Sequence, residues 1–408
     1  MIRLALGAAV ALLPLVAPVP GIATAADAAE PLTYGVRPFA LIDKLADGPL
    51  KEKLLSCTGQ TPKATTFSIG HRGAPLQFPE HSVQSNLAAA RQGAGILECD
   101  VAFTKDKELV CRHAQNDLHT TTNILVTDLA DKCTTPFSAA ADGKPAAAEC
   151  RTSDLTLDEY LTLTPKMDSF DKTAETAEAY QGGMPTWRTT LFNDGAELMT
   201  HKQSIALFKS LGTKFTPELK DPAVEMPFDG YTMDDYAQQL LDEYTAAGIP
   251  ASDVFPQSFN YDVVKYWVAN GGDFAEQAVF LVEPADDWRH DDPSTWVNSP
   301  AEIAAAGVKY LAPSINMLVA LGGEGDIVAS DYAKAAQEAG LKLITWSLER
   351  SGPLSGGGGW YYNSVTDAIS SDADYYNVLN VLAQDVGVVG VFSDWPATVT
   401  YYANCFGL

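Results

Sequence analysis

Two acidic residues on one predicted strand are the first sign of chemistry in this 408-residue chain. Glu98 and Asp100 lie within the apolar run Gly95–Val101. Because alternate side chains of a strand point the same way, the two carboxylates share one face and Cys99 takes the other. Carboxylates about 7 Å apart on a buried strand repel each other unless a cation lies between them. We therefore expect a metal ion beside this strand.

A second apolar run supplies a third carboxylate. The run Lys214–Leu219 continues into Lys220, and Glu218 and Lys220 share a face by the same alternation. Three carboxylates are hard oxygen ligands, which suit Ca²⁺ or Mg²⁺ rather than zinc. We predict that Glu98, Asp100 and Glu218 ligate one divalent cation, Ca²⁺ or Mg²⁺.

The segment after the first two carboxylates has the pattern of a β-hairpin. The polar stretch Lys105–Glu108 separates two apolar runs, and we place the turn between Asp106 and Lys107. This register sets Asp100 opposite His113. The hairpin therefore returns a histidine to the carboxylates.

Another histidine and two cationic residues complete the set. His71 and Arg72 directly follow the apolar run Phe67–Gly70. Histidines at positions 71 and 113 suit acid and base roles, and Arg72 and Lys220 suit the binding of a phosphate. A metal ion, paired histidines and cations together indicate phosphodiester cleavage.

Alternating strand and helix patterns must position these residues. Eight short apolar runs are predicted strands: Phe67–Gly70, Gly95–Val101, Lys214–Leu219, Val254–Phe259, Ala278–Val282, Tyr310–Pro313, Leu343–Ser347 and Val388–Ser393. Five helices are predicted between them: His81–Gln92, Met233–Ala247, Tyr261–Asn270, Pro300–Ala306 and Ser330–Ala339. This alternation predicts an α/β fold, a (β/α)₈ TIM barrel, in which the carboxyl ends of the strands meet at one mouth.

Residues from about 116 to 199 are too many for one loop of such a barrel. We expect a hairpin after strand two and then a long insertion before strand three, placed over one end of the barrel. The insertion contains one helix signal, Thr156–Leu163, with Thr156 and Glu159 forming a capping box. The expected organisation is a signal peptide at 1–25, an N-terminal extension at 26–60 and a catalytic barrel at 61–408.

The first residues have the pattern of a secretory signal peptide. Arg3 precedes the apolar run from Leu4 to Val19, and an A-x-A cleavage pattern ends at Ala25. The run is shorter than the roughly 20 residues of a spanning helix. We therefore expect a secreted or periplasmic protein without a stable membrane anchor.

Export implies an oxidising compartment, where cysteines form disulfides. Cys133 and Cys150 flank a loop rich in Pro, Ala and Gly and are predicted to pair. Cys57 and Cys405 flank the predicted barrel and could join its ends. The pairing of the remaining two cysteines stays open.

Composition limits the partners of the chain. Asp and Glu number 52 against 27 Lys and Arg, which gives a formal net charge of −25. Such a charge repels nucleic acid and anionic lipid, so composition argues against a nucleic-acid binder or a peripheral membrane protein. The sequence leaves the oligomeric state open.

At these residues the sequence resembles the glycerophosphodiester phosphodiesterase family. The matching segments are GHRGAPLQFPEHS, GAGILECDVAFTKDKELVCRH, DLHTTTN, FTPELK, QSF, LITWSL and VVGVFSDWPA, which run in family order from Phe67 to about Thr398. The resemblance implies a TIM barrel that hydrolyses glycerophosphodiesters to glycerol 3-phosphate and an alcohol, using a divalent cation.

The resemblance also implies roles for single residues. Glu98, Asp100 and Glu218 would bind the metal. His71 and His113 would be the catalytic acid and base. Arg72 and Lys220 would hold the phosphate.

We also predict roles for three further residues near the predicted mouth. Glu80 of the Pro-Glu motif would order the mouth or contact the substrate. Trp346 would contact the substrate or belong to the core. We expect Asp394 to cap the turn that follows it.

The chain departs from the family pattern at two positions. His81 stands where Asn is commoner, and Ala114 stands where Asp is commoner. We expect neither departure to touch the three carboxylates.

Two other functions remain open at this point. One is a phospholipase of the D or phosphoinositide-specific C type that acts on intact phospholipids. The other is a non-catalytic protein that binds phosphodiesters. The two histidines argue against the second, because binding alone needs no acid and base.

Overall fold

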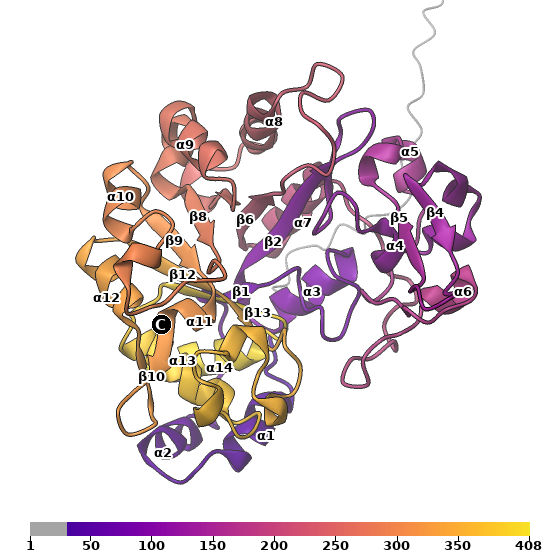
Figure 1. Cartoon of the computed structure of the whole chain (residues 1–408). Coiled ribbons are helices and arrows are strands. Elements are labelled where there is room, and N and C mark those ends of the chain that lie inside the picture. Colours follow the sequence, from indigo (N-terminus) through magenta and orange to yellow (C-terminus); the bar gives the residue numbers. More distant parts are fainter. Residues whose placement is uncertain (1–30) are drawn as a thin grey trace, which may run out of the picture.

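A computed structural model describes residues 31–408, so the predicted signal peptide lies outside the described residues (Figure 1). Eight parallel strands form the centre of the fold: β1 (Thr65–Gly70), β2 (Ala94–Phe103), β6 (Lys214–Leu219), β7 (Gln257–Ser258), β8 (Val279–Val282), β9 (Tyr310–Pro313), β12 (Lys342–Leu348) and β13 (Gly390–Ser393). Strand β1 pairs with both β2 and β13, which closes the sheet into a barrel. The predicted TIM barrel is confirmed.

Helices surround the barrel: α3 (Val83–Arg91), α7 (His201–Leu211), α8 (Met233–Ala246), α9 (Tyr261–Asn270), α10 (Pro300–Ala305), α12 (Asp331–Glu338), α13 (Asp374–Gln384) and α14 (Ala397–Phe406). The five predicted helices are present within two residues at either end. The prediction omitted α7, α13 and α14. Helix α14 is buried along most of its length, so it lacks the polar face that marks a surface helix.

Strand β7 is shorter than the predicted run Val254–Phe259. Only Gln257 and Ser258 belong to the strand. Pro256 precedes them and has no N–H to donate to the ladder, which interrupts the pairing.

The strand alternation separates the barrel interior from its mouth. Ile69 and Ile96 are buried in one apolar cluster with residues of β8, β9, β12 and β13. Two positions further along each strand, on the same face, come His71 and Glu98. The apolar residues therefore fill the barrel and the polar residues lie at its carboxyl end.

The predicted hairpin is present, but its register differs by one residue. Strand β3 (Leu109–Cys111) pairs antiparallel with β2, with Val101 opposite Cys111. Asp100 therefore lies opposite Arg112, whose N–H donates to the Asp100 carbonyl at 2.8 Å, and not opposite His113. The loop has three residues instead of two, because Lys107 takes a left-handed conformation at φ 65°.

The insertion forms a compact lobe beside the barrel (Figure 1). It contains α4 (Leu118–Thr121), β4 (Thr135–Ser138), β5 (Ala147–Glu149), α5 (Leu157–Tyr160) and α6 (Ala177–Tyr180). The lobe has an apolar cluster that includes Tyr160 and Tyr180. It reaches the carboxyl end of the barrel through Asp168, 3.9 Å from Arg350, which follows β12.

Three disulfides join the described cysteines. Cys133–Cys150 is confirmed within the insertion. Cys57–Cys405 joins the segment before β1 to α14, and so the two ends of the barrel domain, as expected. The pair left open, Cys99–Cys111, joins β2 to β3 and so fixes the hairpin.

The remaining elements lie outside the barrel. Helices α1 (Arg37–Lys44) and α2 (Pro49–Ser56) precede β1 and lie near α14 in Figure 1. The short helix α11 (Ile315–Leu318) leads into a hairpin of β10 (Val319–Leu321) and β11 (Ile327–Ala329). Among residues 31–408, no helix is long and apolar enough to cross a membrane.

Candidate active site

The three predicted carboxylates meet at the carboxyl end of the barrel. Asp100 on β2 lies directly beside Glu218 on β6 in the sheet register. Glu98, Asp100 and Glu218 each place an oxygen within 4.8 Å of the others. All three side chains are buried. The alternation predicted from the sequence therefore brings them together.

The electrostatics of this group fit a cation. Burial, and then repulsion from Asp100 and Glu218, raises the pKa of Glu98 well above its usual range. Burial also raises the pKa of Glu218 to about 7. One buried oxygen of Asp100 has no hydrogen-bond partner within residues 31–408. A divalent cation would relieve this repulsion and occupy the free oxygen, so the donor set fits the predicted metal.

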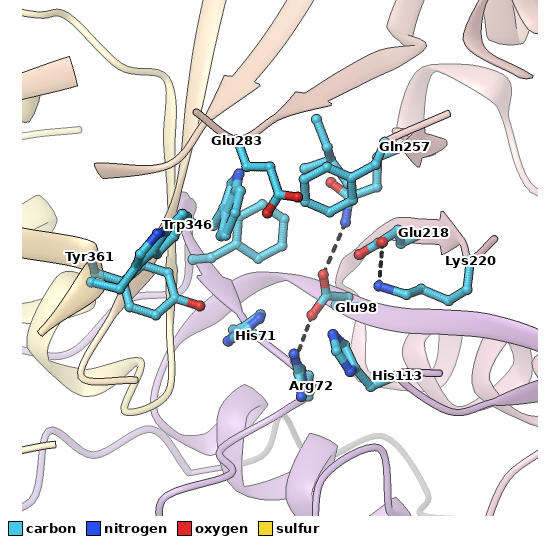
Figure 2. Close-up of a pocket in the computed structure, with 14 residues that line it drawn as sticks. His71, Arg72, Glu98, His113, Glu218, Lys220, Gln257, Glu283, Trp346 and Tyr361 are labelled. Atoms are coloured by element: carbon cyan, nitrogen blue, oxygen red, sulfur yellow. Dashed lines mark hydrogen bonds and ion pairs between the residues drawn. The ribbon is translucent and has the colours of Figure 1, made fainter. Parts of the chain in front are cut away.

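Both predicted histidines line a cavity of about 500 Å³ beside the carboxylates. Figure 2 shows them on either side of Arg72 and Glu98. His71 follows β1, and its Nδ1 lies 2.5 Å from a carboxylate oxygen of Asp394. That contact occupies one ring nitrogen and leaves Nε2 for the cavity. Burial lowers the pKa of both histidines.

Contrary to the expectation from the sequence, Asp394 does not cap the turn that follows it. Its two carboxylate oxygens instead meet His71 and, at 3.3 Å, the guanidinium of Arg350. Burial raises the pKa of Asp394, but Arg350 and His71 outweigh it and lower the value. An ionised carboxylate at this position orients the imidazole of His71.

The two predicted phosphate-binding cations lie at the same cavity. Arg72 has φ 57°, and its backbone N–H donates to Glu98 at 2.7 Å. The Lys220 ammonium lies 2.5 Å from a carboxylate oxygen of Glu218. Both cations therefore flank the carboxylates, where they can contact a phosphate.

Glu80 orders the mouth and does not line the cavity. Its buried carboxylate accepts hydrogen bonds from Arg72 at 3.0 Å and from Arg350 at 3.1 Å. Burial raises the pKa of Glu80, but the two guanidinium groups hold it well below its usual range. Arg350 was not predicted from the sequence, because nothing in its local sequence marks it as part of the site.

His81 contradicts the expectation that the departures from the family pattern stay clear of the carboxylates. It is fully buried with φ 56°, and its Nε2 lies 2.9 Å from Asp100. Burial lowers its pKa to about 4, so the ring is neutral and Nε2 donates to the carboxylate. At the second departure, the N–H of Ala114 donates to Asp117 at 3.1 Å.

Aromatic side chains form the opposite wall of the cavity. Trp346 is partly buried, and its indole stacks with Trp360 at 5.7 Å between ring centres. Phe259 and Tyr361 line the same wall. Trp346 therefore lies at the cavity, which was one of its two expected places. Glu283 also lines the cavity and was missed, because it follows β8 outside any motif.

Comparison with known proteins identifies the family. The model of the glycerophosphoryl diester phosphodiesterase family matches residues 71–398, which include every residue of the site. The chain belongs to this family. Its enzyme class is therefore that of a glycerophosphodiester phosphodiesterase.

Individual proteins show further similarity to this chain. A glycerophosphodiester phosphodiesterase of Haemophilus influenzae is 31% identical over 166 residues, which cover 39% of this chain and 41% of that protein. An extracellular protein of Arthroderma benhamiae is 47% identical over 250 residues, which cover 59% of this chain and all of that protein. A solved structure from Silicibacter pomeroyi has the same fold, with a TM-score of 0.54, 17% identity and coverage of 85% of this chain and 95% of that one.

Proposed function

We propose that the protein is an exported, metal-dependent enzyme that hydrolyses glycerophosphodiesters to glycerol 3-phosphate and an alcohol. The observation that carries this proposal is the meeting of three buried carboxylates with two histidines and two cations around one cavity. The family assignment supplies the substrate class.

Glu98, Asp100 and Glu218 would hold the divalent cation. A bound cation of this kind supplies positive charge that stabilises the charge developing on the phosphate oxygens. Arg72 and Lys220 add two further positive charges from the protein itself. The ligands suit both Ca²⁺ and Mg²⁺, and Ca²⁺ is the more plentiful outside cells.

His71 is suited to take the proton of the nucleophile. Burial keeps its ring neutral, and Asp394 holds Nδ1 so that Nε2 faces the cavity. An adjacent carboxylate also stabilises the imidazolium formed when the proton arrives. The nucleophile is water or a hydroxyl of the substrate's own glycerol, which would pass through a cyclic phosphate.

His113 is suited to protonate the leaving alkoxide. It lines the same cavity on the other side of Arg72. Burial and the charge of Arg72 lower its pKa in the unliganded protein. A bound anionic phosphodiester raises the pKa again, which would let the ring carry a proton when it is needed.

Export is supported by two observations. The three disulfides of the described chain form in oxidising compartments. The Arthroderma benhamiae relative is described as extracellular. With the signal-peptide pattern at residues 1–25, these observations favour a secreted or periplasmic enzyme.

The proposal is tested by comparing a soluble with a lipid substrate. Purified protein is incubated with glycerophosphocholine or with phosphatidylcholine vesicles, in Ca²⁺ or Mg²⁺, and glycerol 3-phosphate, choline and phosphatidic acid are measured. We expect glycerol 3-phosphate and choline from glycerophosphocholine. Turnover of phosphatidylcholine alone would instead identify a phospholipase, and tight binding without turnover would identify a binding protein.

A further inference from the structure

The aromatic wall of the cavity has a carboxylate that the protein leaves unpaired. Glu283 lines the cavity with Trp346, Trp360 and Tyr361. Figure 2 shows its side chain beside Trp346, on the wall opposite the histidines. Within residues 31–408 it forms no hydrogen bond or ion pair, and its side chain is exposed. This carboxylate differs in that respect from Glu98 and Glu218, which are bonded to Gln257 and Lys220.

The aromatic rings are held in fixed positions around the same space. The indole N–H of Trp346 donates to the Ala312 carbonyl at 2.9 Å. The backbone of Trp360 is anchored by the Asn316 amide, which donates to its carbonyl at 3.0 Å. Trp346 also packs edge-on against Tyr361 at 5.8 Å. The wall therefore needs little reorganisation when a ligand binds.

A glycine-rich loop brings Trp360 to the mouth. Gly357, Gly358 and Gly359 all have positive φ, from 59° to 88°. A Cβ on Gly358 would lie 2.6 Å from the Tyr362 side chain, so a larger residue does not fit there. Trp360 nevertheless stays 42% exposed, although its ring is stacked on one side. A large indole surface therefore faces the cavity and solvent.

The charges divide the cavity into two regions. The cations Arg72 and Lys220 lie on the side of the metal-binding carboxylates, where Lys220 is 5.8 Å from the centre of the Phe259 ring. Phe259 stands between Lys220 and Trp346, which it meets edge-on at 5.4 Å. Beyond it, the cavity is lined by the aromatic rings of Trp346 and Trp360, by Tyr361, whose hydroxyl also feels the charges of Arg72 and Arg350, and by the carboxylate of Glu283. One region therefore suits a phosphate and the other suits a positive charge.

We infer that Trp346, Trp360, Tyr361 and Glu283 form a subsite for a quaternary ammonium group in the alcohol part of the substrate, such as that of glycerophosphocholine. This inference rests on the proposed function and adds the head-group class. Aromatic faces attract a cation through the ring quadrupole, and methyl groups on that cation pack against the rings. A primary ammonium needs several hydrogen-bond acceptors, of which this wall supplies one carboxylate. A trimethylammonium group needs none.

The direct test compares glycerophosphocholine with its uncharged isostere, the 3,3-dimethylbutyl ester of glycerol phosphate. The two substrates have the same shape and differ only in the charged nitrogen. We expect kcat/KM to be about tenfold higher for glycerophosphocholine. Glu283→Gln should reduce this ratio, mainly through a higher KM for the charged substrate, and Trp360→Leu should act in the same way. The matched control is Glu324→Gln, an exposed acid in the β10–β11 loop, which should keep the wild-type ratio.

Phosphatidylcholine vesicles and free glycerophosphocholine, assayed side by side, show which source supplies the ammonium group. Turnover of the soluble diester supports the inference as stated, whereas turnover of the lipid alone would overturn it for a soluble substrate. Equal kcat/KM for the charged and uncharged esters would overturn the subsite and leave the hydrolase proposal intact. Loss of activity on every ester would overturn the hydrolase proposal instead. In that case tryptophan fluorescence with tetramethylammonium decides: saturable quenching that Glu283→Gln weakens supports the subsite, and its absence overturns it.

Discussion

At the scale of single residues, the site depends on pairs of buried groups that act on each other. Asp394 fixes the ring of His71, and Glu80 gathers Arg72 and Arg350 behind the cavity. Each of these groups would be costly to bury alone. The acid and base proposed here therefore depend on residues that do not contact the substrate.

Replacing Asp394 tests this dependence. Asp394→Asn keeps the size of the side chain but removes the charge that orients His71. We expect kcat to fall by about a hundredfold or more, the range that one positioned acid or base contributes. The KM should change less, since Asp394 does not line the cavity. The matched control is Asp273→Asn, an exposed residue outside the cavity. A wild-type kcat in a folded Asp394→Asn protein would refute the orienting role.

Asp117 should make stability depend on pH. Burial raises its pKa from 3.8 to about 7. The folded protein therefore binds more protons at Asp117 than the unfolded chain between about pH 4 and 7, so this residue's contribution to stability is present below pH 4 and is lost as pH rises to 7. Urea titrations of wild type and Asp117→Asn at several pH values measure it. The difference in unfolding free energy between the two should change across this window, and a constant difference would show that Asp117 does not titrate there.

At the scale of elements, the hairpin and helix α7 place His113. Strand β3 is held to β2 by the Cys99–Cys111 disulfide and by ladder hydrogen bonds. On its other side, the N–H of Cys111 donates to the Met199 carbonyl at 3.1 Å, just before α7 begins. Helix α7 begins with a capping box between Thr200 and Gln203. The cap therefore supports the segment that leads to His113, the proposed catalytic acid.

Removing that cap should cost a measurable amount of stability. Thr200→Ala deletes the hydroxyl that accepts from the Gln203 N–H at 3.0 Å. We expect the unfolding free energy to fall by about 1 kcal/mol, the usual value of an N-cap. Thr200→Ser keeps the hydroxyl and should stay close to wild type in the same urea titration. An equal loss in both variants would show that the methyl group matters instead of the cap.

Sequence reasoning succeeded where the pattern is local and failed where partners are distant. The alternation of Glu98 and Asp100 and the capping box of Thr156 and Glu159 could be predicted, because each depends on neighbours a few residues away. The contact of His71 with Asp394 joins residues 323 positions apart and has no local signature. The hairpin register was wrong because a single left-handed residue, Lys107, lengthens the loop by one.

At the scale of the whole molecule, a disulfide joins the segment before β1 to α14 far from the cavity. The Cys57–Cys405 disulfide lies close to the amino end of β1, where the Thr65 hydroxyl donates to the Leu408 carbonyl at 2.9 Å. The cavity lies at the carboxyl end of the same strand. The disulfide that stabilises the fold and the cavity of the proposed active site therefore lie at opposite ends of the barrel, as is usual for this fold.

This separation predicts a variant that is less stable but fully active. The double variant Cys57→Ser, Cys405→Ser opens a loop of 348 residues, and we expect the unfolding free energy to fall by about 2–5 kcal/mol. The kcat at a temperature below unfolding should match wild type. Denaturant titration and initial rates on the same preparation measure both quantities. A fall in kcat without a change in the stability of the fold would contradict the separation.

If Glu98, Asp100 and Glu218 hold a cation that the reaction needs, activity must depend on a bound metal ion, and one assay tests this dependence. Glycerol 3-phosphate release from glycerophosphocholine is measured after dialysis against EDTA, and again after Ca²⁺ or Mg²⁺ is returned. We predict no release in EDTA, recovery with one or both ions, and no recovery in folded Asp100→Asn protein. Undiminished release by a preparation whose metal content is shown to be negligible would contradict it.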